Sequence, residues 1–151
     1  MDGSKGPLVG VCDRLGVHHP TFSLAVIIFG STVVGTVYQF YYVKTFLNRY
    51  EISENWFQLA QVLFMVWNAV NDPLFGYFQD IGNGWMRSRK RCILYGAPLY
   101  GLSFLLFWFP WITYSSSTPP WIVGIHLIVA LFCFDALLSF TLLAWSALFA
   151  E

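Results

Sequence analysis

The sequence predicts an all-α integral membrane protein with four transmembrane helices, and three observations support this fold class. Of the 151 residues, 57% are hydrophobic and 11% are charged, whereas soluble domains carry about 25% charged residues. The apolar residues form four long segments, each with the roughly 20 residues that cross a bilayer core. Charged residues are concentrated between these segments, which argues against a helical bundle in water. Strands are disfavoured because an open sheet edge in lipid leaves backbone groups unpaired.

The four helices are expected within a transmembrane domain at 20–151, after an N-terminal tail at 1–19. The tail lacks the apolar core of a signal peptide. Pro20 suits a helix start, where its missing N–H is not needed, and a run ending in Pro119 and Pro120 separates the last two helices. We assign the helices to about residues 21–43, 56–78, 92–113 and 121–149.

Basic residues predict the orientation of these helices. The connection between the second and third segments is strongly basic, whereas the one between the third and fourth has no Lys or Arg. Basic loops stay in the cytoplasm, so an even number of spans places both ends there. Lys44 and Arg49 in the first connection disagree mildly. We expect the plasma membrane as the location, and we expect truncation after the fourth helix because that helix continues to Glu151 without a polar tail.

The most informative stretch is the run Trp-Asn-Ala-Val-Asn-Asp-Pro-Leu-Phe-Gly-Tyr-Phe-Gln-Asp at 67–80. It places Asp72 after 17 uncharged residues, 55–71. A charge near mid-membrane costs about 2.5–3.5 kcal/mol on insertion scales. A carboxylate retained there typically serves an ion, a proton or a polar solute. The alternative is an aspartate that only bonds to a neighbouring helix.

Asn68, Asp72 and Gly76 follow each other at intervals of four residues and therefore share one helix face. Pro73 removes one backbone hydrogen bond and frees the carbonyl of Ala69. An amide, a carboxylate and a free carbonyl together indicate a cation or solute site.

Three further residues are candidates for the same cavity. Asp135 lies near the middle of the fourth segment, where it must face the bundle or a cavity; a contact between helices is the alternative role. Tyr38 and Gln39 lie near the end of the first segment. Polar-tipped aromatic residues there suit either a solute cavity or the membrane interface.

A second candidate feature is an ion-paired latch at the cytoplasmic ends of the second and third helices. Asp80 closes the second helix, and basic residues follow it, so the two groups can pair across the connection. The alternative is a solvated loop that only obeys the topology rule. The basic residues are Arg87, Arg89, Lys90 and Arg91.

The sequence contains no nucleophile–base set, zinc-ligand spacing or phosphate-binding loop. We therefore expect no enzyme activity, no resident cofactor and no metal site. The net charge is zero, so nothing predicts nucleic-acid binding. The expected partners are the lipid bilayer and an unidentified small solute.

Trp67–Gly76 resembles the second-helix signature of the glycoside–pentoside–hexuronide cation symporters of the major facilitator superfamily. Asp80 with Arg87–Arg91 is similar to that superfamily's loop motif, and Ser146–Glu151 is similar to the family's fourth-helix Ser-Ala-Leu-x-x-Glu segment. Among the branches, the animal transmembrane protein 180 branch is the most similar. The resemblance covers about residues 20–151.

The resemblance implies the N-terminal part of a 12-helix major-facilitator fold and a secondary transporter for a carbohydrate or another small polar solute. Na+ or H+ coupling is implied, but Asn68 stands where these symporters carry an aspartate, and Leu142 stands where they carry an acidic sugar ligand. The chain alone is expected not to transport, because the remaining helices close the cavity. The alternative is a non-transporting four-helix interaction or regulatory protein.

Overall fold

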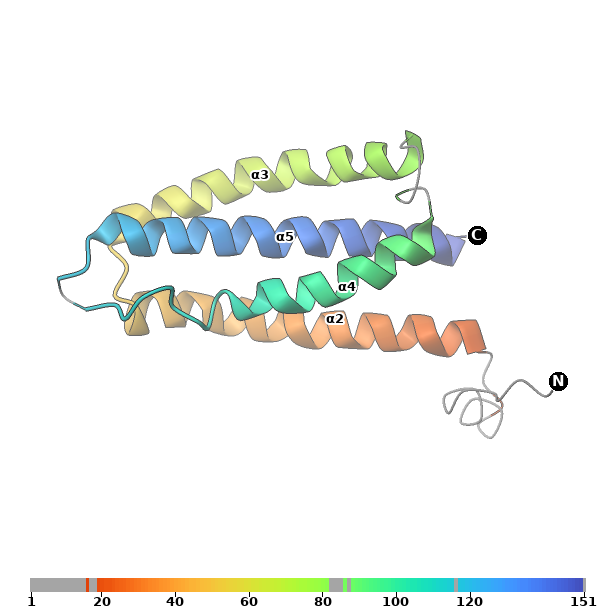
Figure 1. Cartoon of the computed structure of the whole chain (residues 1–151), viewed down its shortest axis with the longest axis horizontal. Helices are drawn as coiled ribbons and strands as arrows, with labels where there is room; N and C mark the ends of the chain where they lie inside the picture. Colours follow the sequence, from red (N-terminus) through yellow and green to blue (C-terminus); the bar gives the residue numbers. More distant parts are fainter. Residues whose placement is uncertain (1–15, 17–18, 82–85, 87, 116, 151) are drawn as a thin grey trace. The chain divides into compact units, whose positions relative to one another are not determined.

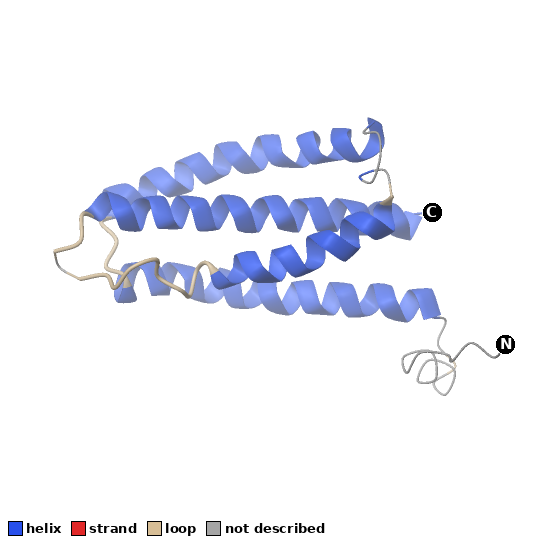
Figure 2. Ribbon diagram, in the orientation of Figure 1, coloured by secondary structure: helices blue, strands red, loops and turns tan. Residues whose placement is uncertain are grey.

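The computed structural model describes residue 16 and residues 19–81, 86, 88–115 and 117–150. Its regular elements follow the chain in the order shown in Figure 1. All of them are helical within these described residues (Figure 2), which confirms the all-α prediction for this part of the chain. They are α2 (His19–Lys44), the π-helical turn η1 (Thr45–Arg49), α3 (Glu54–Ile81), α4 (Arg89–Leu105) and α5 (Pro120–Ala150).

The chain divides into two compact units, residues 1–36 and 37–151, with the boundary inside α2. The expected N-terminal tail lies almost wholly outside the described residues. In the first unit the hydroxyl of Thr36 donates to the carbonyl of Thr32 at 2.7 Å. Such back-bonding within a helix satisfies a hydroxyl in apolar surroundings.

In the second unit, α5 lies between α3 and α4 and packs against both (Figure 1). Glycine allows close approach at two points. A Cβ added at Gly96 of α4 would lie 2.5 Å from Oγ1 of Thr141, and one at Gly124 of α5 would lie 2.5 Å from the ring of Trp56. Small residues at contacts are how membrane helices bring their backbones together.

α4 ends at Leu105, whereas the sequence predicted a helix to about residue 113. The carbonyl of Leu106 would need a donor from residue 110, which is proline and has none. Nε2 of His126 on α5 donates to that carbonyl instead, at 2.6 Å. The hydroxyl of Tyr50 donates in the same way to the carbonyl of Phe107, at 3.3 Å, so the two carbonyls that follow α4 are bonded by side chains from elsewhere in the unit.

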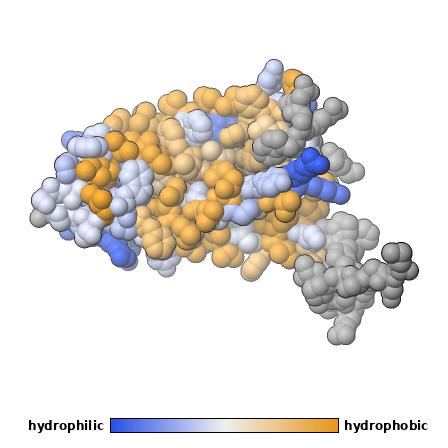
Figure 3. All heavy atoms as spheres, in the orientation of Figure 1, coloured by the Kyte–Doolittle hydropathy of each residue, from blue (hydrophilic) through white to orange (hydrophobic). Residues whose placement is uncertain are grey.

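Within the described part of the chain, two helices are long and apolar enough to cross a membrane, Thr21–Arg49 and Pro120–Ala150. α3 has 28 residues but carries several amide and acidic side chains, and α4 has 17 residues, somewhat fewer than the roughly 20 that a span needs. Figure 3 shows apolar side chains over the middle of the helices and polar ones towards their ends. Four spans remain a prediction.

Candidate functional site

A buried polar pair joins α3 to α5 midway along both helices. Nδ2 of Asn71 donates to Oδ2 of Asp135 at 2.8 Å. Asn71 is fully buried, and Asp135 is 8% exposed. Buried charges require bonded partners, so the amide stabilises a carboxylate that the apolar surroundings would otherwise disfavour.

Only one of the two polar atoms of the Asn71 amide is hydrogen-bonded among the described residues. An ionised carboxylate only accepts hydrogen bonds, so the NH₂ group of Asn71 must face Asp135. This orientation leaves Oδ1 of Asn71 buried without a partner among the described residues. An unpaired buried acceptor typically meets a water, an ion or a ligand donor. Within this pair, Oδ1 of Asn71 is therefore the acceptor that is left for a further hydrogen-bond donor.

A cluster of aromatic and amide side chains lies close to this pair. Tyr38 on α2 stacks on Tyr42 at 4.6 Å between ring centres and contacts Phe134, the neighbour of Asp135, at 4.5 Å. The hydroxyl of Tyr42 donates to Oε1 of Gln61 at 3.4 Å. Nε2 of Gln61 has no partner among the described residues, so a second polar atom here is available to a ligand.

The face predicted from Asn68, Asp72 and Gly76 is not the face that packs against α5. Asn68 and Asp72 are exposed, and a Cβ at Gly76 would meet no atom within 4 Å. Gln39 on α2 is also exposed. The structure brings Tyr38 near Asp135. Among the described residues, neither Asn68 nor Asp72 forms a hydrogen bond with the carboxylate of Asp135.

The face of α3 that contacts α5 consists instead of Asn71, Phe75 and Gln79. Asn71 and Phe75 each come one residue before a member of the predicted set. Phe75 meets Phe140 edge to face at 5.6 Å, and Nε2 of Gln79 donates to the carbonyl of Phe140 at 2.7 Å. Sequence reasoning missed Asn71 and Gln79. The available signal was that Asn71, Phe75 and Gln79 also follow each other at intervals of four residues. They therefore share a helix face just as the predicted set does.

At the end of α3, Arg89 joins two acceptors. Its Nη2 lies 2.6 Å from Oδ1 of Asp80, and its Nη1 donates to Oε1 of Gln79 at 3.4 Å. Gln79 thus connects this ion pair to the backbone of α5. Lys90 and Arg91 are exposed, and Arg87 lies outside the described residues.

Another buried polar cluster surrounds His126 on α5. Its Nε2 donates to Leu106, and its Nδ1 lies 2.7 Å from the hydroxyl of Tyr114. A carbonyl can only accept, so Nε2 carries the proton, and Nδ1 of the neutral ring accepts from Tyr114. Burial raises the pKa of Tyr114, which keeps this hydroxyl a donor at neutral pH.

These features, long apolar helices joined by buried polar side chains, are those of an integral membrane protein. The chain belongs to the MFS/sugar transport protein family, whose family model matches residues 22–151. This confirms the major-facilitator resemblance.

Two relatives are both named Transmembrane protein 180. The protein from Gallus gallus is 29% identical over 152 residues, which cover 89% of this chain and 27% of the relative. The protein from Mus musculus is 30% identical over 135 residues, which cover 80% of this chain and 24% of the relative. The chain therefore spans about a quarter of the length of these curated relatives. No solved structure matches it.

Proposed function

We propose that this chain supplies the first helices of a secondary transporter for a small polar solute, and that Asn71 and Asp135 form the centre of its solute or coupling-ion site. The observation that carries the proposal is the buried pair with its unpaired Oδ1 atom. Polar groups this deep in a bundle belong to solute or ion pathways more often than to the scaffold. A carbohydrate is one candidate solute, in keeping with the family's description.

The exposed face of Asn68 and Asp72 fits the same role. It adjoins the pair along α3, and none of the described helices covers it. In a longer transporter, the remaining helices would enclose this face and complete a cavity. With Tyr38 and Gln39 from α2, the cavity would then carry hydroxyl, amide and carboxylate groups.

Coupling to one Na+ or H+ is a further part of this proposal. Asp135 is the buried carboxylate, and a cation beside it would be held by its second oxygen and by Oδ1 of Asn71. A proton would instead neutralise the carboxylate. Replacing Na+ by choline at constant pH separates the two cases, because only sodium-coupled uptake falls.

Uptake assays on a full-length transporter that contains this segment test the proposal. Asp135→Asn should lower the uptake of a transported solute at least tenfold and remove its dependence on the coupling ion. Asp72→Asn should lower it less. Glu54→Gln, an exposed carboxylate at the start of α3, is the matched control. Wild-type uptake by both aspartate variants would contradict the role given to this site.

The chain alone should not carry solute, because four helices leave the face of Asp72 uncovered. Flux of labelled sugars or polyols into liposomes that contain only the purified chain would refute this. A stable complex of the chain with another membrane protein, together with no effect of Asp135→Asn on the longer protein, would favour the alternative of a non-transporting interaction protein.

The plasma membrane and a cytoplasmic N-terminus are also part of this proposal. The pair of Asp80 and Arg89 would then lie at the cytoplasmic ends of α3 and α4, where the predicted latch would hold these ends together. A protease-cleavable tag is placed at the N-terminus of the chain, and its cleavage by added protease is compared in intact and permeabilised cells. Cleavage only after permeabilisation is expected for a cytoplasmic N-terminus.

A further inference from the structure

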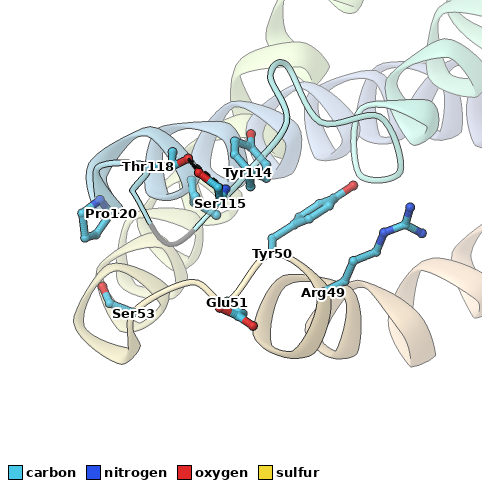
Figure 4. Close-up of a pocket in the computed structure, with 9 residues that line it drawn as sticks. Arg49, Tyr50, Glu51, Ser53, Tyr114, Ser115, Thr118 and Pro120 are labelled. Atoms are coloured by element: carbon cyan, nitrogen blue, oxygen red, sulfur yellow. Dashed lines mark hydrogen bonds between the residues drawn. The ribbon is translucent and has the colours of Figure 1, made fainter.

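A cavity of about 590 Å³ lies beside the first residues of α3 and α5 (Figure 4). Small-molecule sites usually measure about 300–1,000 Å³. The connections before α3 and before α5 form its walls. The lining residues are Arg49, Tyr50, Glu51, Ser53, Tyr114, Ser115, Thr118, Pro120 and Val123.

The aromatic wall of the cavity is held in place from behind. Tyr50 is 5% exposed, and its hydroxyl donates to the carbonyl of Phe107 at 3.3 Å. Its ring centre lies 5.1 Å from that of Tyr114, in an edge-to-face contact. Tyr114 is itself fixed by His126. Two aromatic rings are therefore positioned before any ligand arrives, which lowers the entropy cost of binding.

The cavity carries one charge of each sign. Arg49 and Glu51 flank Tyr50 in the chain, and both are exposed. They do not form an ion pair with each other, and Figure 4 shows their charged groups apart. Each charge is therefore free to meet a complementary group. A lining that is neutral as a whole but divided in this way favours a zwitterion over a simple anion or cation.

Glu51 is held in an unusual backbone conformation, with φ at 49°. It follows η1, where the amides of Tyr50 and Ile52 close the helix end by donating to Thr45 and Phe46, each at 3.0 Å. Glycine or asparagine usually occupies such a position. Strained residues of this kind are frequent where a side chain must be presented to a ligand.

We propose that this cavity binds a zwitterionic solute of the amino-acid type, separately from the central site of Asp135. The guanidinium of Arg49 would take the carboxylate, which it can bind through two parallel hydrogen bonds. Glu51 and the ring of Tyr114 would take the ammonium group. Val123 contributes apolar surface for the side chain of the solute.

Equilibrium dialysis of the purified chain in uncharged detergent micelles tests this, with labelled leucine as the probe. Two analogues each lack one charge: 4-methylpentanoate lacks the ammonium group, and 3-methylbutylamine lacks the carboxylate. Leucine should bind at least tenfold more tightly than either. Equal binding of the three compounds, or no saturable binding of leucine below about 10 mM to folded chain, would overturn the proposal.

Two variants assign the charges. Arg49→Gln should weaken the binding of leucine about tenfold. It should abolish the preference for leucine over 3-methylbutylamine but keep the preference over 4-methylpentanoate. Glu51→Gln should abolish the preference for leucine over 4-methylpentanoate only. Lys90→Gln, at the other end of the helices, is the control and should bind leucine normally. Loss of neither preference, or loss of both in each variant, contradicts the assignment.

Two more variants separate this site from folding and from the proposed transport site. Glu51→Asn removes the charge but suits the left-handed backbone, so it should bind leucine more weakly while unfolding at the same or a higher temperature. A loss of thermal stability together with binding would instead indicate a purely structural role. Asp135→Asn should leave leucine binding unchanged, so failure of the transport proposal does not affect this one.

Discussion

His126 and Asp135 both lie buried on α5, nine residues apart, yet their surroundings differ. Both ring nitrogens of His126 have partners, in Tyr114 and Leu106. Asp135 has one partner, and that partner, Asn71, keeps an acceptor without a hydrogen bond among the described residues. Among the described residues, the polar atoms of the His126 ring are all hydrogen-bonded, whereas one polar atom of the Asn71–Asp135 pair is not.

This difference suits a structural role for the His126 cluster and a binding role for the Asn71–Asp135 pair. A fully bonded polar cluster fixes local geometry, and its stability depends on every member. A cluster with an open position carries an energetic cost that an additional ligand can remove. Substitutions should therefore act in opposite ways, with loss of folding stability at His126 and loss of function at Asp135.

The largest effect on stability is expected for His126→Ala. It leaves the carbonyl of Leu106 and the hydroxyl of Tyr114 without their partners and opens a cavity, which together should cost about 3 kcal/mol. An SDS unfolding titration of the purified chain, followed by circular dichroism, measures this. His126→Gln, whose amide can still reach Leu106, should recover part of the loss. Wild-type stability of the alanine variant would show that this cluster does not support the fold.

Asp135→Asn should behave differently in the same titration. An asparagine keeps a hydrogen bond with Asn71 but removes a buried charge, so we expect stability to be unchanged or higher by about 1 kcal/mol. A large loss of stability would mean that the carboxylate is a structural element, and the contrast with His126 would disappear.

Gln79→Leu should lower the free energy of unfolding by about 1–2 kcal/mol, less than His126→Ala. It removes a buried hydrogen bond to the carbonyl of Phe140 and one acceptor of Arg89. Gln58→Leu is the matched control, since Gln58 is exposed and bonds only to Glu54 among the described residues. Equal effects of the two substitutions would indicate that the contact with α5 contributes nothing.

The sequence predicted the helical class, the family and the approximate helices because those depend on composition and local motifs. It identified Asp135 as a buried polar residue, and Pro110 was a local signal for the early end of α4. The partner of Asp135 was not predictable, because a spacing of four residues fits both Asp72 and Asn71 on α3. Only the rotation of α3 against α5 decides which face is buried, and that rotation depends on long-range packing.

The cavity beside Tyr50 was missed for a similar reason. Its residues come from two connections that are far apart in the sequence and meet only once α3 and α5 have packed. No local pattern relates Arg49 to Thr118. The positive φ of Glu51 also gives no signal, because glutamate is not a residue from which a left-handed backbone is expected.

The smallest effect is expected at the pair of Asp80 and Arg89. Their side chains are 67% and 18% exposed, so water and salt screen the attraction. Asp80→Asn should lower stability by less than about 1 kcal/mol, and the difference should vanish in 1 M NaCl, where the screening length is about 3 Å. A larger loss that persists in salt would make this pair a structural clamp comparable to His126. A small, salt-sensitive loss leaves it free to break and re-form, which is what a latch between moving helices requires.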